Sequence, residues 1–184
     1  MSFQFRILED EIAYTGAELR SGWVAARTGL EGEAAAGFVG PCRVPTENLA
    51  DLDDARAGTF IEAASMAHVI AEHACELPVA VLRQRILVAL LGELLRARGK
   101  RMRRDGDDLY YDDRKLTVSI AAPAAATCVI HLGINVDPAG APVPAVGLTE
   151  MRLDEREILL DLLTRYQREL DGMAYAATKV RTVS

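Results

Sequence analysis

Aromatic residues are scarce in this sequence, and long apolar runs are absent. Phe, Trp and Tyr together make up 5% of the 184 residues, so a hydrophobic core must be built from Leu, Val, Ile and Ala. The longest apolar run, residues 86–91, is far shorter than the roughly 20 residues that a membrane-spanning helix needs. The N-terminus reaches Glu9 and Asp10 without the apolar stretch of a signal peptide. We therefore expect a cytoplasmic protein with no membrane partner.

Cysteine is equally scarce. The three cysteines, Cys42, Cys75 and Cys128, are far apart, and no C-x-x-C pair occurs. This pattern indicates neither a zinc knuckle nor a disulfide framework, and we expect reduced thiols.

The charge balance is acidic, with 21 Lys and Arg against 27 Asp and Glu and a net charge of -6. An acidic chain has no general attraction for nucleic acid, so we expect no nucleic-acid partner. Half of the residues are hydrophobic, and the length fits a single domain spanning 1–184. A homodimer stays open.

The first half of the chain predicts strands and turns over 3–45, an exposed polar loop over 45–58, and a helix over 60–77. The helix is predicted from the four-residue spacing of Ile61, Ser65, Val69, His73 and Leu77. On such a helix His68 and Glu72 would share a face, as metal ligands can. Because no further His or Cys pattern supports a metal, we predict none.

Pro78 suits the first turn of a second helix over 78–98, and Gly99 suits its end. This helix should lie in the core, because an apolar stripe runs along it: Leu82, Ile86, Leu87, Leu90, Leu91, Leu94 and Leu95. Asp154 to Glu157 resemble a capping box and predict the start of a final helix. Its apolar face would contain Ile158, Leu159, Leu162, Leu163, Tyr166 and Leu170.

Between these helices the sequence predicts strands at 109–111, 115–120 and 128–136. Residues 112–114 would form the turn between the first two strands. In the second strand, Leu116, Val118 and Ile120 alternate with polar residues, which indicates one buried face and one polar face. Residues 137–147, rich in Pro and Gly, predict a loop.

One stretch, residues 103–137, resembles the core of lipoate ligases and octanoyltransferases. Lys115 opens a strand that contains Ser119, and His131-x-Gly133-x-Asn135 follows on the next strand. The string Gly133-Ile134-Asn135-Val136 also resembles a strand of the biotin protein ligases. The resemblance implies an α+β fold with a mixed, largely antiparallel sheet flanked by helices.

A resemblance to the family called domain of unknown function 366 spans nearly the whole chain. The strings that carry it are Arg83-Gln84-Arg85, Arg104 to Tyr110, Lys115 to Ala121, His131-x-Gly133-x-Asn135 and Lys179-Val180-Arg181. It implies the same ligase-like fold, with no established activity.

Lys115 is the candidate catalytic residue. Activation of a carboxylic acid by ATP places negative charge on both the carboxylate and the α-phosphate, and a lysine at a strand end can neutralise both. The alternative is a surface lysine paired with Asp112 or Asp113.

The resemblance implies that the strand of His131 lines an acyl pocket. The substrate-binding candidates are therefore His131, Gly133, Asn135 and Ser119. A histidine in a strand is otherwise a half-buried side chain with a satisfied hydrogen bond, and Gly133 would let a ligand approach the backbone.

ATP and Mg²⁺ are the cofactors implied. The nucleotide-binding candidates are Arg103, Arg104, Gly106, Asp107 and Asp108, because guanidinium groups match phosphates and carboxylates hold Mg²⁺. A solvated basic run and turn-forming aspartates are the alternatives. The Arg-Arg-x-Ser-Gly-Gly-Gly motif of lipoate ligases and the Gly-Arg-Gly-Arg loop of biotin ligases are absent. No cysteine follows Cys128, so a thioester mechanism has little support.

Two functions remain open. The first is an enzyme that activates a small carboxylic acid or transfers its acyl group, with a carrier protein as a candidate acceptor. The second is a protein that binds a small ligand or a partner in the same pocket without turnover.

Overall fold

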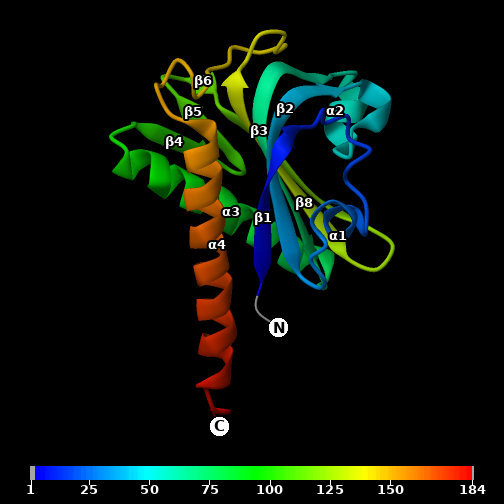
Figure 1. The fold of residues 1–184 in the computed structure, drawn as a ribbon, viewed down its shortest axis with the longest axis vertical. Coiled ribbons are helices and arrows are strands. Elements are labelled where there is room, and N and C mark those ends of the chain that lie inside the picture. The colour runs from blue at the N-terminus through cyan, green and yellow to red at the C-terminus, as the bar shows by residue number, and fades with distance from the viewer. Residues whose placement is uncertain (1–2, 184) are drawn as a thin grey trace.

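A computed structural model describes residues 3–183, and its centre is a five-stranded sheet (Figure 1). The strand order is β1 (Gln4–Glu11), β2 (Ala34–Val44), β3 (Ile61–His73), β8 (Cys128–Asp137) and β7 (Thr117–Pro123). β1 runs parallel to β2, and every other pair in this sheet is antiparallel. The expected α+β fold with a largely antiparallel sheet is confirmed.

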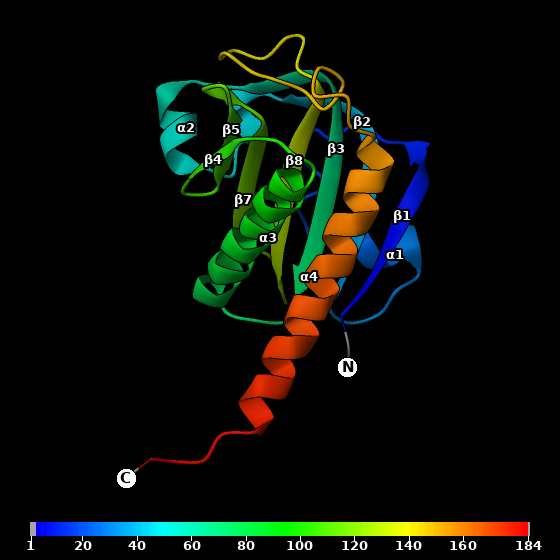
Figure 2. The ribbon, with the colours of Figure 1, turned by 90° about the vertical axis from the view of Figure 1, so that its left-hand side faces the viewer.

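The two faces of the sheet are covered differently. The long helices α3 (Leu77–Ala97) and α4 (Glu155–Thr178) lie side by side on one face (Figure 2). On this face a core forms around Val69, Leu132 and Leu91. The opposite face is covered by α1 (Trp23–Thr28), a 3₁₀ turn at Thr46–Asn48 and α2 (Leu52–Ala57), and here Phe38, Met66 and Trp23 are buried.

A second, three-stranded sheet lies beside the first. It consists of β4 (Met102–Asp105), β5 (Asp108–Tyr111) and β6 (Arg114–Lys115). Asp112 and Asp113 both have positive φ, so the predicted turn is a two-residue hairpin of the kind that matches strand twist. After Lys115 the chain leaves this sheet and enters β7 of the main sheet. The predicted strand 115–120 is therefore divided between two sheets.

The predicted helix over 60–77 is wrong, because these residues form the central strand β3. β3 pairs with β2 along one edge and with β8 along the other. Every residue from Met66 to His73 is buried, so the alternation that marks a half-exposed strand is missing. The four-residue spacing suggested a helix, but a strand that is covered on both faces can carry apolar residues at any spacing.

Other expectations over 3–58 also need correction. The segment predicted as strands and turns contains the helix α1, and the predicted exposed loop contains α2. Asp51 caps α2 by accepting hydrogen bonds from the backbone of Asp53 and Asp54. Both helices have six residues, too few for a hydrophobic period to show in the sequence.

The predicted helices over 78–98 and from 154 onward are confirmed within a residue or two. In α3, Leu87, Leu91, Leu94 and Leu95 are buried, but Leu90 is half-buried and Leu82 is exposed. In α4 all six residues of the predicted apolar face are buried, and Asp154 accepts the hydrogen bond of the Glu157 backbone.

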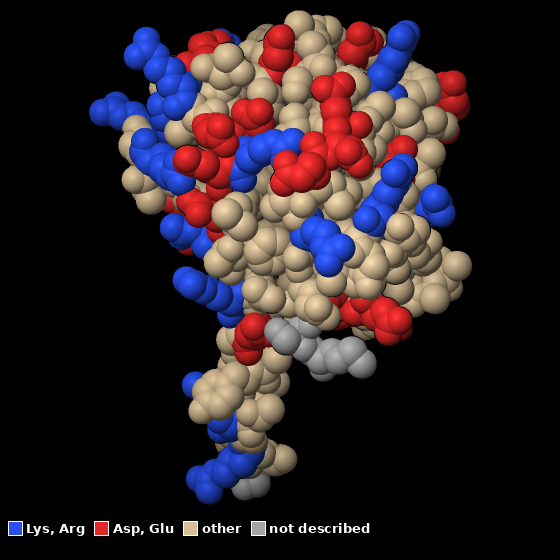
Figure 3. Space-filling model, in the orientation of Figure 1, with Lys and Arg blue, Asp and Glu red and all other residues tan. Residues whose placement is uncertain are grey.

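The C-terminal part of α4 projects beyond the body of the molecule (Figures 1 and 3). Within residues 3–183, neither α4 nor any other helix combines the length and apolarity needed to span a membrane. On the face in Figure 3, acidic and basic side chains lie intermixed over the body, and the tip of the projection carries basic side chains.

Shortening the most deeply buried leucines of α3 should destabilise the fold. Leu91 is completely buried against the sheet, whereas Leu82 on the same helix is 64% exposed. We expect Leu91→Ala to lower the free energy of unfolding by about 2–5 kcal/mol, because it leaves a cavity in the core. Leu82→Ala is the matched control and should change stability by less than about 0.5 kcal/mol in chemical denaturation. Equal effects of the two substitutions would contradict the packing described here.

Candidate functional site

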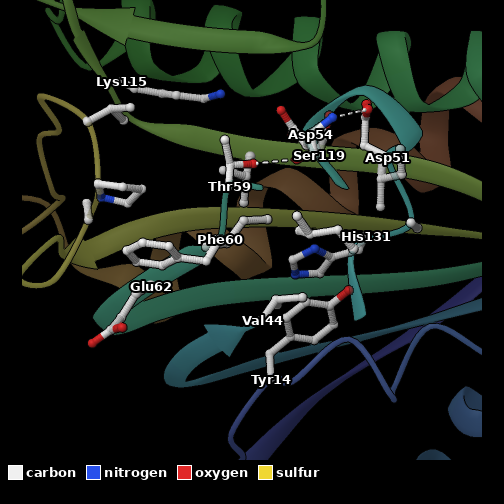
Figure 4. Close-up of a pocket in the computed structure, with 18 of the residues that line it drawn as sticks. Tyr14, Val44, Asp51, Asp54, Thr59, Phe60, Glu62, Lys115, Ser119 and His131 are labelled. Carbon is white, nitrogen blue, oxygen red and sulfur yellow. Dashed lines mark hydrogen bonds between the residues drawn. The ribbon is translucent and has the colours of Figure 1, made fainter. Parts of the chain in front are cut away.

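A cavity of about 490 Å³ lies on the face of the sheet opposite α3 and α4. Its floor is formed by β7 and β8, and its other walls by residues 48–62, residues 141–145 and the start of β5 (Figure 4). This volume is within the range of roughly 300–1,000 Å³ that is usual for small-molecule sites. Most of the lining is apolar, and includes Leu19, Val44, Leu49, Phe60, Val118, Ile120 and Val143.

Lys115 lines this cavity, at the point where the chain passes from one sheet to the other. Its backbone N–H donates to Pro144, and its carbonyl accepts from Val146 and from the side chain of Asn135. These bonds fix the backbone, so the side chain can reach along one wall of the cavity (Figure 4). Its Nζ lies 2.9 Å from Oδ2 of Asp108.

The partner of Lys115 is thus Asp108, and neither Asp112 nor Asp113. Burial raises the pKa of the Asp108 carboxyl, although the ion pair with Lys115 acts in the opposite direction. Both side chains are about three-quarters shielded from solvent. An anion that enters the cavity would therefore meet a lysine whose charge is already partly compensated.

Asp107 and Ser119 form a polar group at the edge of the cavity. Gln84, on α3, donates from Nε2 to Oδ2 of Asp107 and to Oγ of Ser119, both at 2.8 Å. Arg85 adds an ion pair to Asp107 at 3.4 Å. These contacts tie the small sheet to α3 and hold Asp107 in place.

His131 lies on the floor of the cavity and is 2% exposed. Its ring stacks on Tyr14, with the two ring centroids 3.7 Å apart. Nε2 of His131 lies 3.1 Å from Nδ1 of His68, and Nε2 of His68 lies 3.2 Å from the carbonyl oxygen of Gly40. Two histidines and a carbonyl therefore form one buried chain of hydrogen bonds.

Burial keeps both histidines of this chain neutral at pH 7. It lowers the pKa of His68 to about 4, although the bond to Gly40 acts against this. It lowers the pKa of His131 well below its usual range, and a charge on His68 would lower it further.

Asn135 and Gly133 lie on the same strand face as His131, but only Asn135 lines the cavity. The Asn135 amide donates to the Lys115 carbonyl at 3.2 Å. A Cβ on Gly133 would lie 2.7 Å from the Met66 methyl group and 3.1 Å from Val118. Gly133 is thus required by the packing of neighbouring strands.

Arg103, Arg104 and Gly106 are not among the residues that line the cavity. Arg103 lies over the ring of Tyr110 and pairs with Asp113, and Arg104 donates to the Gly106 carbonyl within its own hairpin. Of the nucleotide-binding candidates, only Asp107 and Asp108 border the cavity. Both are paired with cations of the chain itself.

His68 and Glu72 also have local partners. Glu72 accepts hydrogen bonds from the Gly22 backbone and from Thr127. Among residues 3–183, no group of three or more His, Cys, Asp or Glu is placed to hold a metal ion.

The sequence analysis did not identify three side chains of the site: Tyr14, Phe60 and Gln84. Tyr14 and Phe60 come from segments that reach the cavity only through the fold. Gln84 carries a signal, because it is a polar residue one turn before Leu87 and Val88 on a buried helix face. A buried amide there needs hydrogen-bond partners, and it finds them in Asp107 and Ser119.

Comparison with known proteins places the chain in a family. Residues 3–181 match the family described as Domain of unknown function (DUF366). The chain belongs to the DUF366 family. It is 33% identical over 172 residues to the uncharacterized protein MJ0805 of Methanocaldococcus jannaschii, which covers 89% of this chain and 78% of that protein.

Solved structures agree with this placement and with the fold. A protein of unknown function from Pyrococcus horikoshi is 34% identical, with a TM-score of 0.94 over 100% of both chains. A biotin protein ligase from Aquifex aeolicus in complex with biotin and ATP has a TM-score of 0.60 at 16% identity, over 91% of this chain and 70% of that chain. Ta0514, a lipoate protein ligase homologue from T. acidophilum with bound lipoic acid, has a TM-score of 0.57 at 14% identity, over 93% and 87%. This DUF366 protein therefore has the fold of the biotin and lipoate ligases, as its sequence suggested.

The neutral histidines predict how stability depends on pH. In the unfolded chain each histidine titrates near pH 6.5, but in the folded chain burial holds the pKa of His68 at about 4. As the pH falls below 6.5, the unfolded state therefore takes up protons first, and stability is lost down to about pH 4. Between pH 5 and 6 His68 should contribute a slope of about 1.4 kcal/mol per pH unit.

Denaturant unfolding at several pH values measures this slope, and His68→Gln is the matched control. Between pH 5 and 6, the free energy of unfolding of His68→Gln should change by about 1.4 kcal/mol less per pH unit than that of the wild type. Identical slopes in the two proteins would mean that His68 carries a proton when folded.

Proposed function

We propose that this protein holds a small carboxylic acid in the cavity and activates it or transfers its acyl group, with Lys115 as the cation that meets the carboxylate. The observation that carries the proposal is the placement of the Lys115 ammonium on the wall of a largely apolar cavity. An apolar cavity accepts the hydrocarbon part of such an acid, and a lysine in a partly desolvated site attracts its charged end. The biotin- and lipoate-binding structures with this fold support the same class of ligand.

Lys115 would act by exchanging partners. The incoming carboxylate takes the place of Asp108 at Nζ, so its negative charge, and the charge that develops on its carbonyl oxygen during acyl transfer, lies next to the ammonium group. In activation, a carboxylate oxygen would bond to the α-phosphorus of ATP while the bond from that phosphorus to pyrophosphate breaks, and pyrophosphate would leave. Asp107 and Asp108 offer carboxylate oxygens for Mg²⁺, but each would first have to release its own cation. The anchoring role of Lys115 does not depend on the metal.

A second function, binding without turnover, is favoured by the position of Arg103 and Arg104. Both arginines contact their own hairpin, away from the cavity, so they do not fit the role of phosphate ligands in this arrangement. A protein of this kind would bind the acid, or the acid on a carrier protein, through Lys115 alone.

The proposal predicts opposite effects for the two partners of the ion pair. In a thermal-shift screen and in calorimetric titration with octanoate, lipoate and biotin, Lys115→Ala should weaken binding of the preferred acid by about tenfold to a hundredfold, the usual worth of a charge-assisted hydrogen bond. Asp108→Asn should strengthen it, because a competing carboxylate is removed. Lys115→Arg should not restore activity, because a planar guanidinium does not replace a compact ammonium.

Acid-dependent exchange of labelled pyrophosphate into ATP distinguishes the two functions. Exchange in the wild type that disappears in Lys115→Ala supports activation. Tight binding of an acid without pyrophosphate exchange supports binding without turnover over ATP-dependent activation. If none of the acids raises the melting temperature, or if Lys115→Ala binds as the wild type does, the proposal is wrong.

A further inference from the structure

The hydrogen-bond chain beneath the cavity determines which ring nitrogens carry protons. The Gly40 carbonyl can only accept, so Nε2 of His68 must carry a hydrogen. A neutral His68 then has a bare Nδ1, which accepts from Nε2 of His131. A neutral His131 with its hydrogen on Nε2 has a bare Nδ1 in turn. The chain therefore ends in a hydrogen-bond acceptor.

That acceptor is open to the cavity. Within residues 3–183 no hydrogen bond is made to Nδ1 of His131, whose ring is held by Tyr14 on one face and by His68 at Nε2. In the same part of the chain, the only side-chain nitrogen or oxygen that is both fully buried and unpartnered is Nε of Arg83. Nδ1 of His131 thus keeps a surface that a ligand can reach, although the residue as a whole is 2% exposed.

Lys115 and His131 offer a ligand opposite chemistry, because Lys115 donates and is positive, whereas His131 accepts and is neutral. The cavity wall also carries the polar side chains of Asp51, Asp54, Thr59 and Glu62. Figure 4 shows Lys115 and His131 on opposite sides of the space. A purely aliphatic tail would cover Nδ1 and leave a buried acceptor without a partner, which is costly. A tail with an ether or ketone oxygen would place a second acceptor against it.

We infer that the ligand is a carboxylic acid whose far end carries an O–H or N–H group, and that this group donates a hydrogen bond to Nδ1 of His131. The inference rests on the proposed function, because it takes the carboxylate of the same ligand to lie at Lys115. It selects hydroxy-, amide- or urea-bearing acids over unsubstituted fatty acids. His131 is then a determinant of ligand specificity. The hydrogen bonds through His68 to the Gly40 carbonyl fix the His131 tautomer whose Nδ1 is bare and can accept.

Matched ligands test this without changing the protein. Calorimetric titration at pH 7.5 would compare the straight-chain acids from hexanoic to decanoic with their ω-hydroxy and ω-methoxy counterparts. The hydroxy and methoxy compounds carry an oxygen at the same position, but only the hydroxy compounds can donate. At the best-fitting length we expect the ω-hydroxy acid to bind about tenfold more tightly than the other two.

The protein-side control is His131→Phe, which keeps a ring on Tyr14 and removes the acceptor. In this variant the ω-hydroxy and ω-methoxy acids should bind equally, while binding of both still depends on Lys115. A long-range ¹H–¹⁵N spectrum of the wild type reports the tautomers directly and does not depend on the stability of any variant. It should show bare Nδ1 and protonated Nε2 on both His68 and His131, and a shift of the His131 Nδ1 signal when the ω-hydroxy acid is added.

Failure of this inference differs from failure of the proposed function. If acids bind through Lys115 but the hydroxy and methoxy compounds are equal in the wild type, the donor requirement is wrong and the acid-binding proposal stands. A protonated Nδ1 on His131 would overturn the inference as well. If no acid of any series binds, both proposals fail.

Discussion

The pairing of β3 with β8 at the centre of the sheet is the constraint on which the site depends. Both faces of these two strands are covered, by the long helices on one side and by α1, α2 and the cavity lining on the other. A polar atom that is buried between these layers, away from the cavity, needs a partner within the protein, because water does not reach it. His68 and His131 answer this requirement with each other and with Gly40. The orientation of His131 at the cavity is therefore a product of core packing, and the site inherits the rigidity of the sheet.

Lys115 depends on a different feature, the passage of the chain from the small sheet to the large one. Two sheets that meet at Leu116 leave a short connection whose backbone must be hydrogen-bonded from outside, and the loop at 144–146 and Asn135 supply those bonds. The Asn135 side chain thus holds the backbone of the lysine. A substitution at Asn135 would remove one of the three hydrogen bonds that fix the Lys115 backbone.

Much of this arrangement was visible in the sequence where one physical signal dominates. The stripe of α3 and the capped start of α4 each follow from one dominant local signal, and each was predicted. The predicted alternation over 115–120 is wrong, because Thr117 is buried while Val118, Ser119 and Ile120 are all partly exposed. β3 was not predicted, because a strand buried on both faces has no alternation, and the four-residue spacing from Ile61 to Leu77 indicated a helix instead. The same limit applies to the site. The order of residues indicated Lys115, His131 and Asn135. The partner of Lys115 could not be chosen among the five aspartates of 105–115, since the choice depends on how this segment lies against the sheet. Tyr14, His68 and Phe60 come from segments whose place at the cavity is set only by tertiary contacts.

The cavity is bordered on one side by strands of the main sheet and on another side by residues 48–62, which include α2. α2 has six residues and buries none of them. Its first residue, Leu52, is 67% exposed, and Phe60, which follows the helix, is 43% exposed. A segment with so little buried surface opens with a free energy far below that of global unfolding, whereas the strands beneath it open only when the whole domain does. Amide hydrogens over residues 50–60 should therefore exchange with solvent orders of magnitude faster than those of β3 and β8. A ligand that packs against Phe60 should therefore slow the exchange of these amide hydrogens.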